Sequence, residues 1–160
     1  MDPAGDSALV SNLSSIHSLF FDETLYFNDV EVLKQQMVQI NHPRYLKTQG
    51  TLVPSVLSII KPHDFVELLF KSETESDFLK ALNLLQPHSQ KFILYALHPG
   101  LTRPDFESTL KQISKIAHDS PLVLEPDSDF VGMFEYQQLA QNYFTEVRVI
   151  PRLPFTDQLN

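Results

Sequence analysis

The feature that most constrains the fold of this chain is an internal repeat. The segments SIIKPHDFVELLF (58–70) and NLLQPHSQKFILY (83–95) both place an aliphatic pair, a polar residue and Pro-His before an apolar run that ends in an aromatic residue. Aligning the chain with itself at an offset of 25 residues superposes Pro62 and His63 on Pro87 and His88. A second echo, Asp77-Phe78-x-x-x-Leu82 against Asp105-Phe106-x-x-x-Leu110, has an offset of 28. Similar segments at nearly equal spacing indicate structural units that stack on one another.

Each unit is predicted to be a helix, a polar-Pro break, a second helix and a polar loop. Asp77 and Asp105 stand where helix N-caps are expected. Pro62 and Pro87 stand where the second helices would begin, at a position that tolerates a missing N–H. Because a short helical hairpin cannot bury both of its apolar faces, neighbouring copies are expected to share a core. The predicted fold class is mainly α, a compact bundle of short helical hairpins with solenoid-like stacking. Residues 56–60 and 81–85 are predicted to be equivalent helix segments, with these side chains buried: Leu57, Ile60, Leu82 and Leu85.

The rest of the chain is expected to complete a single helical domain over 1–150, with the repeat-like core at 53–118 and a tail or linker at 151–160. Residues 7–21 carry an apolar stripe at helical spacing. Asn28 is a plausible N-cap, with Glu31 at the capping-box position, for the next helix. Residues 134–145 are also predicted to be helical. One small two-stranded β element is expected, formed by 121–125 with 146–150.

Composition and charge exclude several classes of protein. The 160 residues include no Cys, which rules out disulfide scaffolds, thiolate metal sites and cysteine nucleophiles. Only four Gly are present, which argues against a hairpin-rich all-β fold and against a Gly-rich phosphate loop. The net charge of -8 has no compensating basic block, so nucleic acid and anionic membranes are poor partners.

No targeting or membrane-spanning segment is recognisable in the sequence. It has no run of 18 apolar residues, and the N-terminus MDPAGDSALV lacks the basic region of a secretory signal peptide. We therefore expect a cytoplasmic protein, in its own or a host cytosol, without membrane insertion.

The histidines are the first candidates for chemistry. His63 and His88 lie one repeat apart, and stacked repeats would separate them by roughly 10 Å. A shared metal ion needs ligand atoms about 2 Å away, so no metal site is predicted there. His98 with Asp105, and His118 with Asp119, are possible acid–base pairs that chance also explains, since the chain has 6 His and 20 acidic residues. No nucleotide-binding or nucleophile-elbow motif is present, so no catalytic residue and no cofactor is assigned.

The acidic run SETESD (72–77) is most simply a solvated loop that places negative charge at a helix N-terminus, and alternatively a patch for a basic partner. The segment LFFDETLYF (19–27) carries more aromatic side chains than one short segment can bury, so some are candidates for an interaction surface. The alternative for this segment is that its rings tuck into the core. The candidate interaction residues are Phe21, Tyr26, Phe27 and, in the tail, Phe155.

The stretch DFLKALNLLQPHSQKFILYAL (77–97) resembles the short helical repeats of effector proteins from intracellular bacteria such as Legionella, and the resemblance extends over 53–118. Those segments serve mainly as interaction or spacer modules. The resemblance thus implies a non-catalytic protein–protein interaction domain, of an effector that acts in a host cytosol. Two alternatives stay open: a small hydrolase or transferase with a site between the repeats and 121–150, and an acidic secretion chaperone or adaptor.

If the aromatic segment is an interaction surface, Tyr26 is the preferred anchor, because its hydroxyl suits a half-wet rim while its ring supplies contact area. Tyr26→Ala is then expected to weaken partner binding by about 2 kcal/mol or more with little loss of fold stability. Titration of the partner, together with thermal unfolding of the variant, measures both. An unfolding midpoint that falls with the affinity would instead place this ring in the core.

Overall fold

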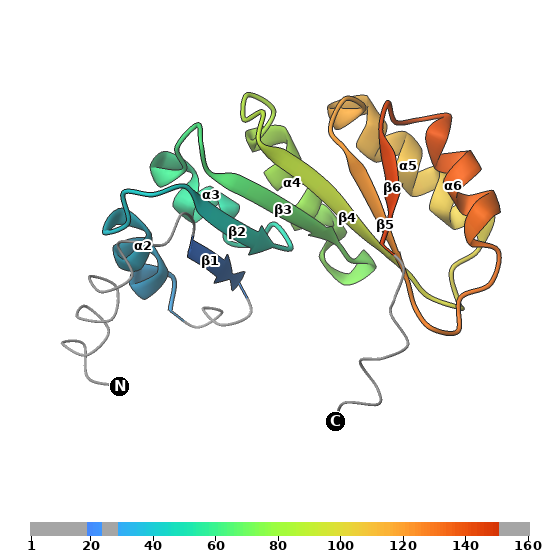
Figure 1. Cartoon of the computed structure of the whole chain (residues 1–160), viewed down its shortest axis with the longest axis horizontal. Coiled ribbons are helices and arrows are strands. Elements are labelled where there is room, and N and C mark those ends of the chain that lie inside the picture. The colour runs from blue at the N-terminus through green and yellow to red at the C-terminus, as the bar shows by residue number, and fades with distance from the viewer. Residues whose placement is uncertain (1–18, 24–28, 151–160) are drawn as a thin grey trace.

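The computed structural model of the chain describes residues 19–23 and 29–150, which form an α/β structure built on one parallel sheet. Its strands are β1 (Leu19–Asp22), β2 (Arg44–Thr48), β3 (Phe65–Phe70), β4 (Lys91–Leu97), β5 (Leu122–Pro126) and β6 (Val147–Val149). The helices are α2 (Val30–Val38), α3 (Val53–Val56), α4 (Glu75–Leu84), α5 (Arg103–Ala117) and α6 (Met133–Gln141), with single 3₁₀ turns at Leu57–Ile59 and Ser72–Thr74. The strands lie side by side in chain order, so the colour in Figure 1 runs steadily from blue to red across the sheet. The predicted mainly α-helical bundle is therefore wrong.

The error lies in the second half of each repeat, which is a strand and not a helix. Segments 65–70 and 91–97 are short apolar runs without clear alternation, and such runs do not distinguish a strand from a buried helix. Strands inside a parallel sheet commonly have this composition. The low glycine content does disfavour hairpins, but parallel strands are joined by helices and need few tight turns. The stretch 53–118 that resembles helical repeats contains both β3 and β4, so it is not helical throughout.

The repeat itself is present as strand register. Leu68 pairs with Ile93 and Leu69 with Leu94, which is the 25-residue offset found in the sequence. The same offset joins Leu19 to Arg44 and Leu122 to Val147 at the two ends of the sheet. Each unit is a helix followed by a strand. The second echo marks the equivalent faces of α4 and α5, where these four side chains are buried: Phe78, Leu82, Phe106 and Leu110.

The local predictions of buried residues and helix caps are partly right. Leu82 and Leu85 are buried at the end of α4, whereas Leu57 and Ile60, after α3, are half-buried. The N-caps of α4 and α5 are Thr74 and Thr102, not the predicted aspartates, and the Thr102 hydroxyl accepts a hydrogen bond from the Asp105 N–H at 3.3 Å. The cap of α2 is Asp29, one residue after the expected Asn28. Segments 121–125 and 146–150 do pair, as β5 and β6, but they belong to the six-stranded sheet and do not form the separate two-stranded element that was expected.

All described helices pack on the same face of the sheet. The larger core cluster joins α4, α5 and α6 to alternate strand residues, among them Leu68, Ile93 and Leu122. The smaller cluster joins α2 and the end of α3 to Phe21 and Leu46. Since these strand residues all point to one side, the helices form a single layer. None of the helices in the described ranges is long and apolar enough to cross a membrane.

A buried ion pair ties the first units together. Arg44 begins β2 and Asp64 precedes β3, and their side chains are only 1% and 4% exposed. The Arg44 Nε donates to both Asp64 carboxylate oxygens at 3.1 and 3.2 Å, and its two terminal nitrogens donate to the carbonyls of Met37 and Ile59 at 2.5 Å each. Asp64 also accepts from the backbone N–H of Lys61 at 2.7 Å. The pair thus joins the ends of α2 and the 57–59 turn to two strands.

The hydrogen bonds of this pair set the ionisation of Asp64. Burial alone would raise the pKa of the Asp64 carboxyl, but the hydrogen bonds from Arg44 and from the Lys61 N–H outweigh burial, and the pKa is lowered from its ordinary value of 3.8. A carboxyl whose folded pKa is depressed stabilises the fold above its unfolded pKa. That contribution is lost as the pH falls below about 3.8 toward the folded pKa.

Arg44→Met is expected to reduce the free energy of unfolding by about 3–5 kcal/mol, because it leaves the Asp64 carboxylate buried without its cation. The double change Arg44→Met with Asp64→Leu should recover much of this loss, since a buried pair is replaceable by apolar side chains. Denaturant unfolding at neutral pH measures both. The matched control is Arg103→Met, which breaks the exposed pair of Arg103 with Glu135 and should cost less than about 1 kcal/mol. Equal losses for Arg44→Met and Arg103→Met would contradict a central role for the buried pair.

Candidate functional site

The face of the sheet opposite the helices is the most unusual surface of the molecule. Its side chains alternate along the strands with those of the core and belong to neither core cluster. We call it the open face, and its described residues are Phe20, Asp22, Tyr45, Lys47, Phe65, Glu67, Leu69, Phe92, Leu94, Ala96, Val123, Glu125 and Arg148. All-parallel sheets normally have both faces covered. In the ranges 19–23 and 29–150, the helices cover only one.

Four aromatic rings form a ladder across the first four strands of the open face. Phe20, Tyr45 and Phe65 occupy one row of the sheet, and Phe92 continues from Phe65 by a diagonal step. The ring centroids of successive residues are 5.2, 5.4 and 5.5 Å apart. The first three rings are stacked, with interplanar angles of 27° and 13°. Phe20, at the end of the ladder, is 55% exposed, and the other three are half-buried.

The stacking decides what the ladder can bind. Neighbouring strands lie about 4.8 Å apart, so rings that stack on one another across strands stand upright on the sheet. Their faces contact each other, and their edges point to solvent. A nucleic-acid base or a sugar ring is usually held on an exposed aromatic face. The ladder instead presents a ridged apolar surface made of ring edges.

Charged side chains lie in the row next to the ladder, where Asp22 is level with Lys47 and Lys47 is level with Glu67. Glu67 is almost completely buried although no described helix covers it. Burial raises the pKa of the Glu67 carboxyl above its ordinary value of 4.5. Glu125 and Asp22 raise this pKa further, whereas Lys47 and a hydrogen bond from Tyr45 oppose the rise.

A row of aliphatic side chains follows the charged row. Leu69 is level with Leu94, and Leu94 is level with Val123. Leu94 and Val123 are only 4% and 7% exposed on this face. The open face therefore combines an aromatic ladder, a charged row and an aliphatic row.

A separate pocket of about 520 Å³ lies at the carboxyl ends of β3 and β4. It brings His98 and Asp105, a pair considered from the sequence, together with Lys71 and Glu75. Burial raises the pKa of the Tyr95 hydroxyl in its wall to about 12, so this group stays protonated at neutral pH. The carboxyl ends of parallel strands are common ligand sites. In the described part of the chain, however, the His98 ring makes no hydrogen bond that would activate a nucleophile.

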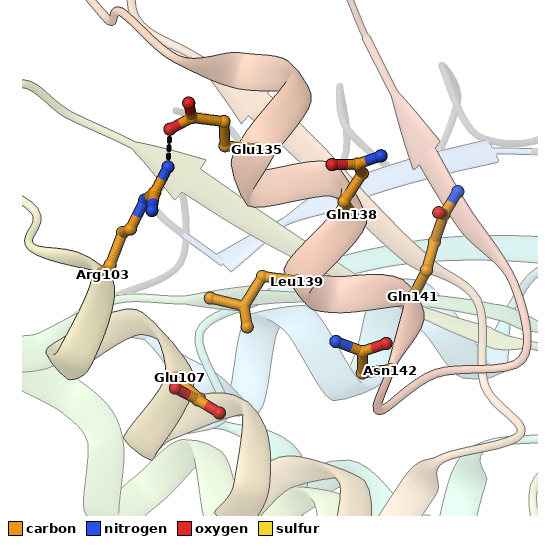
Figure 2. A pocket seen from close by; sticks show the side chains of 7 residues that line it. All are labelled: Arg103, Glu107, Glu135, Gln138, Leu139, Gln141 and Asn142. Carbon is orange, nitrogen blue, oxygen red and sulfur yellow. Dashed lines mark ion pairs between the residues drawn. The ribbon is translucent and has the colours of Figure 1, made fainter.

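A polar groove of about 650 Å³ runs between α5 and α6, close to the place where an enzyme site was considered from the sequence (Figure 2). Arg103 at the start of α5 forms an ion pair with Glu135 of α6, as the dashed line shows. Glu107 accepts a hydrogen bond from the Tyr143 hydroxyl at 2.5 Å and faces Lys111 at 3.7 Å. The charged groups of this groove are thus engaged with one another, which leaves little to act on a substrate.

Both prolines of the Pro-His motifs and His88, but not His63, line an apolar pocket of about 380 Å³ at the amino ends of β3 and β4. The His88 Nε2 lies 2.7 Å from the Asp64 carbonyl oxygen, so this imidazole links the loops that precede the two strands. His63 is exposed. No group of three or more His or acidic side chains in the described ranges is arranged to hold a metal ion.

Of the four interaction residues predicted from the sequence, one lies in the core and three lie outside the described residues. Phe21 is 2% exposed and lies in the smaller core cluster, so its ring is not on the surface. Tyr26, Phe27 and Phe155 lie outside the described residues. Phe20, the neighbour of Phe21 in β1, is 55% exposed. The acidic run 72–77 leads into α4, so its carboxylates lie at a helix N-terminus, but after a strand and not between two helices.

The rest of the ladder was missed because β2, β3 and β4 were not recognised as strands. The signal that could have revealed it is alternation within strands of known register: Tyr45, Phe65 and Phe92 stand at alternate positions to core residues.

Comparison with protein-family models, with characterised proteins and with solved structures finds no match for this chain.

Glu67→Gln is expected to raise the unfolding midpoint at neutral pH. A carboxyl whose folded pKa is raised loses stability as the pH rises from its ordinary value through the folded one, and glutamine does not titrate. The stability difference between the two proteins should therefore shrink as the pH falls to about 4.5 and below. Thermal unfolding between pH 4 and pH 8 checks this. Glu125→Gln should reproduce part of the effect, because Glu125 raises the Glu67 pKa. Parallel pH profiles for the parent and Glu67→Gln would show that the pKa of this carboxyl is not raised in the folded protein.

Proposed function

We propose that this chain is a non-catalytic protein-binding domain and that the open face of its sheet is the binding surface. The observation that carries the proposal is a parallel sheet with helices on one face and apolar side chains on both. Both faces of such a sheet are normally covered, because otherwise the apolar side chains of one face are exposed to water. Exposed aromatic side chains gathered beside charged ones mark an interaction site in a soluble domain.

The charges of the open face support a partner with basic groups. Asp22, Glu67 and Glu125 are acidic, whereas Lys47 and Arg148 are basic. Arg148 is already engaged, since its guanidinium pairs with Glu146 on the same strand edge. The chain as a whole carries a net charge of -8. A partner with lysine or arginine near its apolar contacts would therefore be attracted over a long range and discriminated from acidic proteins.

The unfavourable placement of Glu67 also fits a binding surface. A buried carboxyl close to two other acidic side chains lowers the stability of the isolated domain. Binding surfaces often retain such features, because a partner's charge can compensate them in the complex. An adaptor or chaperone that masks a partner is one form that this function can take.

The hydrolase or transferase alternative has less support. Its best location is the pocket with His98 and Asp105, which is of ligand size. An acid–base site also needs a base held against a nucleophile or a water position. The open face instead carries four aromatic rings that belong to neither core cluster, of which Phe20 is exposed and the other three are half-buried.

Phe65→Ala is expected to weaken partner binding by about 2 kcal/mol or more, since central aromatic residues dominate interface energetics. Phe65 stacks on Tyr45, contacts Phe92 at a tilt and belongs to neither core cluster, so the loss of stability should be small. Capture of proteins from lysate by the parent and the variant, quantified by mass spectrometry, identifies the partner. Titration calorimetry with that partner then gives the change in affinity.

The matched control is Phe134→Ala, which removes an aromatic side chain that is 69% exposed on α6, away from the open face. It should leave binding unchanged. Circular dichroism and thermal unfolding verify that both variants are folded. Retention of every partner by Phe65→Ala, with loss caused by Phe134→Ala, would move the interface to the helix layer and refute the proposal.

A further inference from the structure

The spacing of the aromatic ladder matches one kind of secondary structure in a partner. Successive ring centroids are 5.2, 5.4 and 5.5 Å apart across the strands. One turn of an α-helix rises about 5.4 Å, so side chains that recur once per turn have the same period. Side chains on one face of an extended strand recur about every 6.6–6.8 Å and fall out of step with the rings within two repeats.

The shape of the ladder agrees with its period. The rings stand edge-on, so the surface has ridges with shallow grooves between them. Helices pack by placing rows of side chains into such grooves. A helix laid across the strands, along the line from Phe20 to Phe92, would place one apolar side chain per turn over each shallow groove between neighbouring ring edges.

The neighbouring rows define the sides of this helix. The charged row runs along the ladder through Asp22, Lys47 and Glu67, and the acidic side chains outnumber the basic one. Beyond it lies the aliphatic row with Leu69 and Leu94. A helix seated on the ladder would therefore turn one flank toward acidic groups, where lysine or arginine is favourable.

We infer that the open face binds an amphipathic α-helix of a partner protein, laid across the strands on the aromatic ladder, with apolar side chains at i, i+4 and i+7 and basic side chains on the flank beside Asp22 and Glu67. This inference rests on the proposed function, since it names the chemistry of the partner at the same surface. A second copy of this chain fits less well, because it would bring the same acidic excess to the interface.

The test uses the full chain as bait for two displayed peptide libraries of equal composition. One library presents randomised positions on a stable single helix, and the other presents them in an unstructured, extended format. The helical library is expected to yield binders with apolar residues at helical spacing and lysine or arginine on one flank. Replacing a central residue of a selected helix by proline should weaken binding at least about tenfold, because proline breaks the helix.

Variants of the chain then locate the selected helices. Phe65→Ala should weaken their binding at least about tenfold, and Phe134→Ala should leave it unchanged. Asp22→Asn should weaken it by about threefold, the range of an exposed charge pair, and the effect should shrink at high salt. These results together would support a helix on the ladder.

The other outcomes separate the inference from the proposed function. Binders from the extended library alone, with alternating apolar residues and sensitivity to Phe65→Ala, would overturn the helix and leave the binding surface standing. Concentration-dependent self-association that Phe65→Ala abolishes, seen by light scattering, would identify a second copy as the occupant and would also overturn it. Binders insensitive to Phe65→Ala, or no binders and no self-association, would refute both.

Discussion

The structure depends on the parallel pairing of strands that follow one another in the chain. A parallel strand pair needs a crossover connection, and such crossovers have one favoured hand. When every strand is added beside the previous one, the same hand places every helix on the same face. The core clusters show this arrangement, since α2 to α6 pack on one set of alternate strand residues. The open face is therefore a consequence of the strand order, and its apolar side chains are the part that needs explanation.

The units are not equivalent along the sheet. Most register steps are 25 residues, but Tyr45 pairs with Phe65, only 20 residues away, and the helix between them is the four-residue α3. The short connection still buries Leu52, Val53 and Val56, and Val53 joins the larger core cluster whereas the other two join the smaller one. The Arg44–Asp64 pair lies at this joint and fixes it by directional hydrogen bonds. The buried ion pair thus fixes the end of α2 and the 57–59 turn against β2 and the start of β3.

The sequence predicts the repetition and the helix faces of this fold better than it predicts which apolar segments are strands. Repetition, the faces of α4 and α5 and the pairing of 121–125 with 146–150 were within reach, because side-chain periodicity and spacing encode them. The identity of β3 and β4 was not, since an apolar run such as FVELLF lacks the alternation that marks a half-exposed strand. Interior parallel strands are apolar on both sides, and local propensity cannot show that helices will flank them.

The candidate site could not be predicted from the sequence for a similar reason. An aromatic surface near residue 20 was anticipated, yet Phe21 faces the core and Phe20 faces outward, because β1 is extended and alternate side chains point to opposite faces. The ladder joins residues up to 72 positions apart, from Phe20 to Phe92, and only the register of four strands brings them together. Long-range register is not contained in any local pattern. The charged row beside the ladder was unpredictable for the same reason.

The Arg44–Asp64 pair also constrains how relatives of this chain can diverge. A change at either position alone leaves an uncompensated charge in the interior, so the intermediate between two viable sequences is poorly folded. Related chains are therefore expected either to keep both residues or to have lost both, with few that carry one. Substitutions at these two positions are therefore expected to occur together. The exposed rings of the open face have no such coupling to the fold and are able to change one at a time as partners change.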